Sequence, residues 1–472
     1  MLTFKKIAQS DIDFFIHVCG LDNVHTEGDD RLILAASDQT EDLVFYPEVV
    51  VRPSNEGEIS RLMAYCHENH IPVTPRGAGT GLSGGALPIY GGVVLDTSRL
   101  NKIIRIDTDN FLTITQPGVI TQLLQETVIE KGLFYPPDPS SRGSCFIGGN
   151  VAENAGGPRA VKYGTTRDFV LSLRAVLPNG KIIHTGAPTL KNVTGYNLTQ
   201  LLVGSEGTLA IITEITLKLI PYPKYRLLML ASFHSAEESC SCVARIFQAG
   251  ITPSALEFIE RDAIDFTCHV RKDLNFNVPS EMQSQLLIEL DGQDLEQLYQ
   301  ESEVLSEVLE KNGAFDILFA DDQASQDNLW SLRRAIGAAV KSHSVYKEED
   351  TVVPRYNLPL LLNGVKEIGR KYSFRSVCYG HAGDGNLHVN ILKDNLSDDF
   401  WNGELKKAIE EIFILCKNLG GTISGEHGIG YVQKEFLPLV FSETEIQLQK
   451  SIKNIFDPHC ILNPGKIFPD LS

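Results

Sequence analysis

The sequence predicts an α+β protein built from two main parts. Up to about residue 222, short strands and helices alternate with glycine-rich loops. After Pro223, the order strand, helix, strand occurs twice in series, which is typical of a ferredoxin-like split sheet. A chain of 472 residues also allows roughly two to four domains of ordinary size. We therefore expect a domain boundary near residue 222.

The first part contains an amphipathic helix, expected at residues 54–70. Ser54 or Asn55 can cap its N-terminus, and Ile59 and Leu62 begin an apolar face with a 3.6-residue period. Alternating apolar residues, caps and turn signals predict the other elements. They are strands at 71–76, 92–96, 111–116 and 208–219, a helix from about 121 to 132, and a hairpin at 174–185 whose Asn179-Gly180 pair supplies positive φ angles.

The second part follows the repeated strand, helix, strand order. Its predicted strands lie at 227–233, 254–259, 285–290 and 315–320, and its predicted helices at 236–248, 295–311, 328–341 and 358–371.

Composition excludes several classes of function. Acidic residues outnumber basic residues by 60 to 42, a net charge of −18 that repels phosphate backbones, so we expect no nucleic-acid partner. The nine cysteines lack zinc-ribbon spacing and indicate reduced thiols. No stretch approaches the roughly 18 apolar residues of a transmembrane segment. We expect a soluble, cytoplasmic protein, with peripheral association at the inner face of a membrane as the alternative.

A glycine-rich segment follows the strand predicted at 71–76. Gly79, Gly81 and Gly84 spell the dinucleotide fingerprint G-x-G-x-x-G, but the breaker-rich residues 87–92 leave no room for the helix that a Rossmann unit needs. The Lys-Ser/Thr of a P-loop is also missing. Such a loop still presents unobstructed backbone N–H groups, which is the physical requirement for holding a pyrophosphate. The alternative is a flexible turn.

Three further segments have the same character, at residues 137–142, 147–157 and 204–209. One long, flat ligand contacted by several backbone loops would account for all of them.

These segments carry a family resemblance. PRGAGTGLSGGA, PPDPSS, GGNVAENAGG, KYGTTRD, KNVTGYN and GSEGTLAIITE resemble the FAD-binding domain of the vanillyl-alcohol oxidase and para-cresol methylhydroxylase flavoproteins. The sequence is most similar to their glycolate oxidase, D-lactate dehydrogenase and D-2-hydroxyglutarate dehydrogenase branch. No histidine lies between His70 and His184, where covalent relatives often attach the flavin, so we expect non-covalent FAD.

The resemblance implies both the FAD-contacting residues and the domain plan. Residues 1–222 would form the FAD-binding domain, 223–440 the ferredoxin-like substrate (cap) domain with a metal site, and 441–472 a segment that returns to the FAD domain. The implied FAD contacts are Arg76, Gly77, Ala78, Gly79, Thr80, Gly81, Leu82, Ser83, Gly84, Pro137, Asp138, Ser140, Ser141, Gly148, Gly149, Asn150, Asn154, Gly157, Gly204, Gly207, Thr208 and, in the closing motif LNPGK, Asn463.

A hairpin with two histidines is predicted at residues 376–390. Asp384-Gly385 is a two-residue turn signal, and counting outward from it pairs His381 with His388. Directly opposed residues have Cβ atoms about 5 Å apart, so the two imidazoles could share a metal ion. The alternative is an ordinary pair of cross-strand histidines.

A third ligand is available in the segment at 421–430, a glycine-flanked strand end that contains Glu426 and His427. Two His and one Glu with an open position suit a catalytic Zn²⁺, or alternatively Mn²⁺ or Fe²⁺. The resemblance implies His381, His388 and Glu426 as ligands and His427 as the general base.

A substrate carboxylate needs a positive partner. An arginine fork matches a carboxylate, and Arg333 on the helix at 328–341 corresponds to the family's carboxylate-binding arginine. Asn390 matches an asparagine of the 2-hydroxyglutarate enzymes. Where those enzymes carry a hydroxyl residue and a lysine for the distal carboxylate, this chain has Gly337 and Glu348. That departure favours a small substrate.

The expected activity is FAD- and metal-dependent oxidation of a small D-2-hydroxy acid, D-lactate or glycolate, with hydride transfer to flavin N5. Electrons would pass to a separate acceptor: a quinone, a cytochrome, an electron-transfer protein or a partner subunit. The chain could also form a homodimer. The alternatives are D-2-hydroxyglutarate dehydrogenase, a flavin subunit of a larger glycolate oxidase-type complex, and a non-redox enzyme of the same fold.

Overall fold

The computed structural model describes residues 3–40, 43–273 and 278–469 and forms two compact units. Unit 1 comprises Met1–Gly156, Thr165–Tyr222 and Glu426–Ser472, and unit 2 comprises Gly157–Gly164 and Pro223–Gly425. The chain thus returns to unit 1 at Glu426, whereas we expected this return at residue 441. Main-chain N–H groups of Ile429 and Gly430 donate to Glu206 at 2.9 and 2.6 Å, which binds this segment to unit 1.

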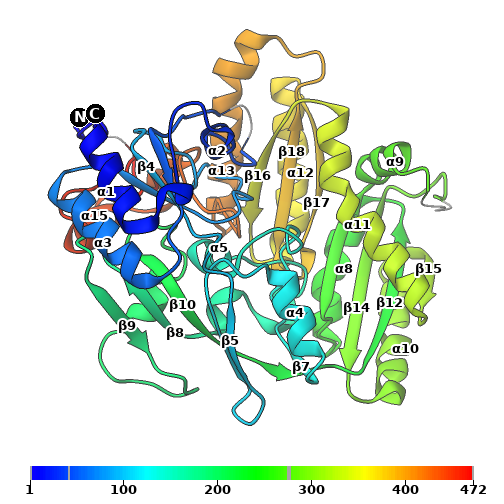
Figure 1. Ribbon diagram of the computed structural model, residues 1–472. Helices are drawn as coiled ribbons and strands as arrows, with labels where there is room; N and C mark the ends of the chain where they lie inside the picture. The colour runs from blue at the N-terminus through cyan, green and yellow to red at the C-terminus, as the bar shows by residue number, and fades with distance from the viewer. Residues whose placement is uncertain (1–2, 41–42, 274–277, 470–472) are drawn as a thin grey trace. The chain divides into compact units, whose positions relative to one another are not determined.

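One sheet of unit 1 has the strand order β1-β2-β4-β3, with β2 and β3 parallel to β4 (Figure 1). Ile59, Leu62 and Met63 of helix α3 (Glu56–Glu68) pack into the apolar core with valines of these strands, as the 3.6-residue period predicts. The strands are β1 (Val24–His25), β2 (Val49–Val51), β3 (Val73–Arg76) and β4 (Val93–Asp96).

The second sheet of unit 1 is antiparallel and has the order β5-β6-β10-β8-β9; its β9, β8 and β10 lie side by side in Figure 1. The hairpin predicted at 174–185 is present, but of its Asn-Gly pair only Gly180 has a positive φ, because the connection is longer than two residues. β5 was not among the strands expected from the sequence. The strands are β5 (Ile103–Asp107), β6 (Leu112–Thr115), β8 (Val170–Val176), β9 (Ile182–Gly186) and β10 (Ile211–Lys218), with a small pair of β7 (Leu133–Phe134) and β11 (Ile220–Pro221) beside them.

Short helices complete unit 1. Part of the segment GGNVAEN, which we interpreted as a glycine-rich loop, is helical in the structure. The helices are α1 (Gln9–Cys19), α2 (Asp30–Ala35), α4 (Thr121–Ile129), α5 (Ile147–Glu153), α7 (Leu198–Leu202), α14 (Leu437–Val440) and α15 (Glu443–Phe456).

Unit 2 is built on a seven-stranded antiparallel sheet of order β15-β12-β14-β13-β17-β18-β16, which Figure 1 shows from its right edge inward. The first four strands have the 4-1-3-2 order of a ferredoxin-like fold, which confirms the predicted fold class. The strands are β12 (Tyr225–Phe233), β13 (Ala255–Glu260), β14 (Ser284–Gly292), β15 (Ala314–Ala320), β16 (Tyr346–Val352), β17 (Arg375–Gly380) and β18 (Asn386–Leu392). The last three extend the sheet, and β16 was not predicted.

Helices cover both faces of this sheet. Ser239 of α8 bonds Ser284 on one face, whereas Trp330 and Arg333 of α11 bond Glu289 and Glu257, which project from the other. The helices are α6 (Ala160–Tyr163), α8 (Ala236–Gln248), α9 (Arg261–Val270), α10 (Leu295–Lys311), α11 (Gln323–His343), α12 (Leu358–Tyr372) and α13 (Leu405–Asn418). Among the described residues, no helix combines the length and the apolar character that a membrane crossing requires.

The turn between β17 and β18 requires glycine at position 385. Gly385 has φ +78°, and a Cβ atom there would lie 1.9 Å from the carbonyl oxygen of Val353. The Gly385→Ala substitution should therefore lower the free energy of unfolding by about 2 to 4 kcal/mol, from left-handed strain and overpacking. Gly403→Ala is the matched control, because a Cβ at this helical position meets no described atom within 4 Å. Urea denaturation of both variants checks this, and equal stabilities would contradict it.

Candidate functional site

One face of the unit 2 sheet carries a row of polar side chains. His388 on β18 is paired with Tyr379 on β17 and with Asp350 on β16, and directly paired residues project from the same face. Glu348, two residues before Asp350, shares that face and pairs with Asn390. His388, Tyr379, Asp350 and Asn390 are all buried. The extension of the sheet beyond the ferredoxin-like strands thus builds the polar side of a site.

The predicted pairing of His381 with His388 is wrong, because His388 lies opposite Tyr379. The turn is longer than the predicted two residues: His381 lies beyond the end of β17 and precedes the single 3₁₀ turn Ala382–Asp384. His388 thus pairs with a residue two positions before His381, and residues two apart along an extended chain project from the same side. The two imidazole rings are therefore still neighbours, with centroids 5.5 Å apart.

Glu257 on β13 contacts both His381 and Arg333. Its carboxylate accepts from Nδ1 of His381 at 2.8 and 2.9 Å and from Nε of Arg333 at 2.8 Å, and Nη2 of Arg333 forms an ion pair with it at 2.6 Å. Burial raises the pKa of Glu257, but the charges and hydrogen bonds of His381 and Arg333 outweigh this and hold its pKa below the ordinary value. Since an ionised carboxylate only accepts, Nδ1 of His381 carries a proton, and Nε2 is the ring nitrogen whose lone pair could bind a metal.

Arg333 is almost fully buried, and its guanidinium carbon lies 5.2 Å from the ring centroid of Tyr379. Glu257 occupies the edge of the guanidinium formed by Nε and Nη2. Arg333 is therefore held in one orientation, and the end formed by Nη1 and Nη2 is the part that could bind an anion.

Asp350 fixes the segment that leads to the predicted third ligand. It is fully buried and accepts from Nδ2 of Asn386 at 2.7 Å, from the hydroxyl of Ser424 at 3.1 Å and from the main-chain N–H of Gly425 at 2.7 Å. Glu426 and His427 follow Gly425 directly. At about 3.8 Å per residue, the chain connection keeps both close to this end of the sheet.

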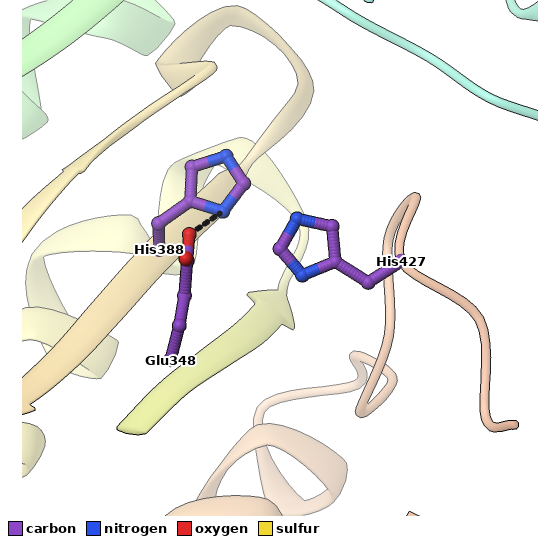
Figure 2. A group of neighbouring side chains, drawn as sticks. All are labelled: Glu348, His388 and His427. Carbon is purple, nitrogen blue, oxygen red and sulfur yellow. Dashed lines mark ion pairs between the residues drawn. The ribbon is translucent and has the colours of Figure 1, made fainter. Parts of the chain in front are cut away.

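The ligand atoms of two groups of side chains lie within 4.8 Å of one another: His381, His388 and Glu426, and Glu348, His388 and His427. Figure 2 shows the second group, in which Nδ1 of His388 lies 3.2 Å from a carboxylate oxygen of Glu348. His388 belongs to both groups. Imidazole nitrogens and carboxylate oxygens are the ligands that Zn²⁺, Mn²⁺ and Fe²⁺ accept, so these residues fit a divalent metal.

Asn390 and Gly337 lie on the side of the sheet that carries His388 and Glu348, whereas Lys347, the residue before Glu348 in β16, projects from the other face. Asn390 is fully buried and donates to the carbonyl of Val377 at 3.3 Å. A Cβ at Gly337 would lie 3.5 Å from the hydroxyl of Tyr379. Lys347 points its ammonium over the ring of Trp401, 5.4 Å from the centroid.

In unit 1, the side chain of Arg76 braces the glycine-rich loop. It donates to the carbonyls of Leu34 and Ser37 at 3.0 and 2.8 Å, and to that of Ala35 at 3.5 Å. A Cβ at Gly79 would lie 2.3 Å from Nη2 of Arg76. The guanidinium thus bonds main-chain carbonyls of the protein, and contact between Arg76 and FAD stays a prediction.

Several other predicted FAD contacts also use their side chains to fix loops. Asp138 pairs with Arg142 at 3.0 Å, Asn150 donates to Thr121 at 2.7 Å, and Asn463 donates to the carbonyl of Gly85 at 3.0 Å. Backbone is left for a ligand where glycine has no neighbour: a Cβ at Gly81 or Gly149 would meet no described atom within 4 Å.

The other expected FAD residues occupy the same segments. Ser83 has a buried hydroxyl without a hydrogen-bond partner among the described residues, which suits a ligand rich in acceptors. Gly157 is the exception, because it begins the short stretch assigned to unit 2. Gly77, Ala78, Thr80, Leu82 and Gly84 lie in the loop after β3, Pro137, Ser140 and Ser141 in the loop after β7, Gly148 in α5, Asn154 at its C-terminal end, and Gly204, Gly207 and Thr208 before β10.

Buried charges surround the start of the returning segment within unit 1. Burial raises the pKa of Glu206, and the N–H groups of Ile429 and Gly430 oppose this rise. Burial also lowers the pKa of Lys466 to about 7, and its ammonium donates to the carbonyls of Gly85 and Leu87 at 3.3 and 2.7 Å. The segment after His427 is therefore tied to the predicted FAD loop.

Sequence reasoning missed Glu257 and Asp350 as site residues. Glu257 is flanked on both sides by apolar residues in the strand ALEFIE, and a carboxylate in that position was the available signal. Asp350 and Glu348 lie in β16, which was not predicted because the acidic run KEED lacks the alternating apolar residues that indicate a strand.

Known protein families match both parts of the chain. Residues 47–186 match a family model described as FAD binding domain, and residues 222–467 match one described as FAD linked oxidases, C-terminal domain. D-lactate dehydrogenase of Anaerostipes hadrus is 40% identical over 432 residues, 89% of each chain. Glycolate oxidase subunit GlcD of Bacillus subtilis (strain 168) is 38% identical over 454 residues, 96% of this chain and 95% of the relative.

The fold has a solved counterpart. p-Cresol methylhydroxylase with substrate bound superposes with a TM-score of 0.81 at 17% identity, over 100% of this chain and 99% of that chain. This likeness confirms the fold expected from the glycine-rich motifs. With matches to both of its domains and relatives of nearly equal length, the chain belongs to the FAD-linked oxidases.

Proposed function

We propose that this FAD-linked oxidoreductase oxidises a small D-2-hydroxy acid, D-lactate or glycolate, with the help of a divalent metal. The observation that carries the proposal is the group His381, His388 and Glu426, whose ligand atoms lie within 4.8 Å of one another. A hydroxyl and a carboxylate on adjacent carbons can chelate one metal ion. The likeness to proteins named D-lactate dehydrogenase and glycolate oxidase supports the same substrate class.

His381, His388 and Glu426 would hold the metal, with Zn²⁺ favoured and Mn²⁺ or Fe²⁺ as alternatives. A divalent cation there supplies Lewis acidity that lowers the pKa of the substrate hydroxyl. His427 takes the hydroxyl proton, since a neutral imidazole is the usual base near neutral pH. Glu348, in the group of His427 and His388, would keep negative charge beside that imidazole and stabilise its protonated form.

Arg333 binds the substrate carboxylate through the end formed by Nη1 and Nη2. Glu257 fixes the opposite edge, so little side-chain entropy remains to be lost when the substrate binds. The substrate Cα is thereby oriented by two contacts, its carboxylate on Arg333 and its hydroxyl near His427. Asn390 contributes hydrogen-bonding capacity on the same face.

A small monocarboxylate suits this site better than D-2-hydroxyglutarate. Glu348 is an acidic group 3.2 Å from His388, and it would repel a second substrate carboxylate. Lys347 is directed at Trp401. A 2-hydroxyglutarate substrate would need a cation that these positions do not supply.

FAD, when bound, supplies the two-electron acceptor for the substrate hydrogen. The match of residues 47–186 to a family described as FAD binding domain supports FAD binding there, and the lack of a histidine between His70 and His184 favours non-covalent attachment. The electrons then pass to a separate acceptor, a quinone, a cytochrome, an electron-transfer protein or a partner subunit. The likeness to a protein named as a glycolate oxidase subunit favours, as a second candidate, a flavin subunit of such a complex.

An anaerobic titration of the FAD-loaded, metal-loaded chain tests the proposal. D-Lactate or glycolate should bleach the flavin absorbance, and L-lactate and D-2-hydroxyglutarate should not. Bleaching by D-2-hydroxyglutarate alone would establish the alternative dehydrogenase, and no bleaching by any of them would refute hydroxy-acid oxidation.

Metal binding should depend on His388, which belongs to both donor groups. We expect the wild-type chain to bind one divalent ion, and the His388→Ala variant to bind it at least about 100-fold more weakly, since even outer partners of ligands contribute 10- to 100-fold. Competition with a chromophoric chelator measures the affinity. His184→Ala, an exposed position on β9, is the control. Equal affinities in both variants would place the metal elsewhere.

The His427→Gln substitution should lower the rate constant of flavin reduction by about 10²- to 10⁴-fold, because the base is lost. The wild-type rate should fall as the pH decreases and the imidazole becomes protonated, and the variant should lose that decline. Stopped-flow absorbance over pH 5 to 9 measures both effects. His459→Gln, which removes an imidazole stacked on His67 in unit 1, should keep the wild-type profile. Unchanged reduction by the His427 variant would exclude it as the base.

A further inference from the structure

We propose that Glu257 is a positioning residue that orients a metal ligand and the substrate-binding arginine together, so that metal affinity and substrate affinity both depend on it. The inference rests on the proposed function, because it assigns roles to His381 and Arg333. Nothing in the sequence motifs indicated this residue.

Both oxygens of Glu257 are used. Oε1 accepts from Nδ1 of His381 at 2.8 Å. Oε2 accepts from the same nitrogen at 2.9 Å and from Nε of Arg333 at 2.8 Å, and it forms an ion pair with Nη2 of Arg333 at 2.6 Å. Glu257 has no exposed surface, and Arg333 and His381 are 6% and 4% exposed. One carboxylate thus bridges an imidazole and a guanidinium inside the protein, where neither could find a substitute partner in water.

The bridge determines which nitrogen of His381 can bind a metal. A carboxylate that accepts from Nδ1–H fixes the tautomer whose lone pair is on Nε2, and it also increases the basicity of the ring. Arg333 lies against the same carboxylate, so the bridge holds the guanidinium and the imidazole in fixed positions relative to each other.

A second contact path joins the same residues. The guanidinium of Arg333 lies 5.2 Å from the ring centroid of Tyr379, and that ring lies 5.5 Å from the ring of His388. Arg333 is therefore in contact with residues that adjoin both histidines. A shift of the guanidinium would disturb the surroundings of two ligands.

A neighbouring glutamate shows what a merely structural carboxylate does in this sheet. Glu289 on β14 is 1% exposed and shares the face of Glu257, since it pairs with Ala255, two residues before Glu257. It accepts from Ser254 and Trp330, both at 2.9 Å. Trp330 lies one turn before Arg333 on α11. The two glutamates thus anchor one helix in the same way, but only Glu257 contacts a proposed metal ligand.

The comparison of Glu257→Gln with Glu289→Gln separates positioning from anchoring. Glutamine offers one acceptor oxygen, so at position 257 either His381 or Arg333 faces an amide N–H₂ group. We expect Zn²⁺ affinity, measured by chelator competition on the FAD-loaded full chain, to fall about 10- to 100-fold in Glu257→Gln. In Glu289→Gln it should stay within about twofold of wild type, although both variants lose a buried charged hydrogen bond.

Two further readouts would not respond to a structural role alone. The visible absorption of bound Co²⁺ should change in Glu257→Gln and not in Glu289→Gln, because it reports the ligand geometry. The KM for the hydroxy acid should rise several-fold in Glu257→Gln at saturating metal, since Arg333 loses its orientation.

The outcomes of these experiments separate the role of Glu257 from the proposed metal dependence on which it rests. Absence of metal binding in the wild-type chain would refute the proposed metal dependence itself. Metal binding by the wild type that is equally weakened, or equally unaffected, in the two variants would overturn only the role of Glu257. If Glu257→Gln fails to fold, Glu257→Asp keeps the charge and withdraws the carboxylate by one methylene; unchanged metal affinity in that variant would also overturn the inference.

Discussion

The buried negative charge on one face of the unit 2 sheet is the constraint on which the packing of this unit depends, and two of its three carboxylates, Glu257 and Asp350, also hold the site in place. Glu257, Glu289 and Asp350 are each at most 1% exposed, and a buried carboxylate is tolerated only when cations or hydrogen-bond donors surround it. Arg333, His381, Trp330, Asn386 and the main chain at Gly425 supply those donors. The need to satisfy these carboxylates fixes the helix, the histidine and the connecting turn in single positions.

Carboxylates also hold the chain on each side of the point where it leaves unit 2. Within unit 2, Asp350 accepts from the N–H of Gly425 at 2.7 Å, and within unit 1, Glu206 accepts from those of Ile429 and Gly430 at 2.9 and 2.6 Å. Glu426 and His427 lie between these anchors. A short segment held at both ends retains little conformational freedom, which is what a metal ligand and a base require.

Much of this architecture could be predicted from local sequence, and what could not depended on contacts distant in the chain. The helices α8 and α10 occur at the predicted residues because capping and apolar period are local signals. The histidine pair was identified, but its register was not, since a two-residue turn and a 3₁₀ turn share the Asp-Gly signal. Glu257 could not be assigned, because its partners lie 76 and 124 residues away.

The glycine-rich loops illustrate the same limit. Their composition indicated a ligand that contacts backbone, and a matching FAD-binding family supports that interpretation. Composition could not show that the guanidinium of Arg76 donates to the carbonyls of Leu34 and Ser37. It also could not show that helix α5 forms within the segment GGNVAEN, because both features depend on tertiary packing.

The proposed oxidation requires a catalytic metal on the polar face of this sheet. Anomalous X-ray scattering from crystals of the Zn²⁺-loaded chain, recorded on both sides of the zinc absorption edge, tests it most directly. We expect one anomalous peak bound by Nε2 of His381, an imidazole nitrogen of His388 and a carboxylate oxygen of Glu426. A peak bound by other residues, or no peak in crystals grown with excess zinc, would contradict it.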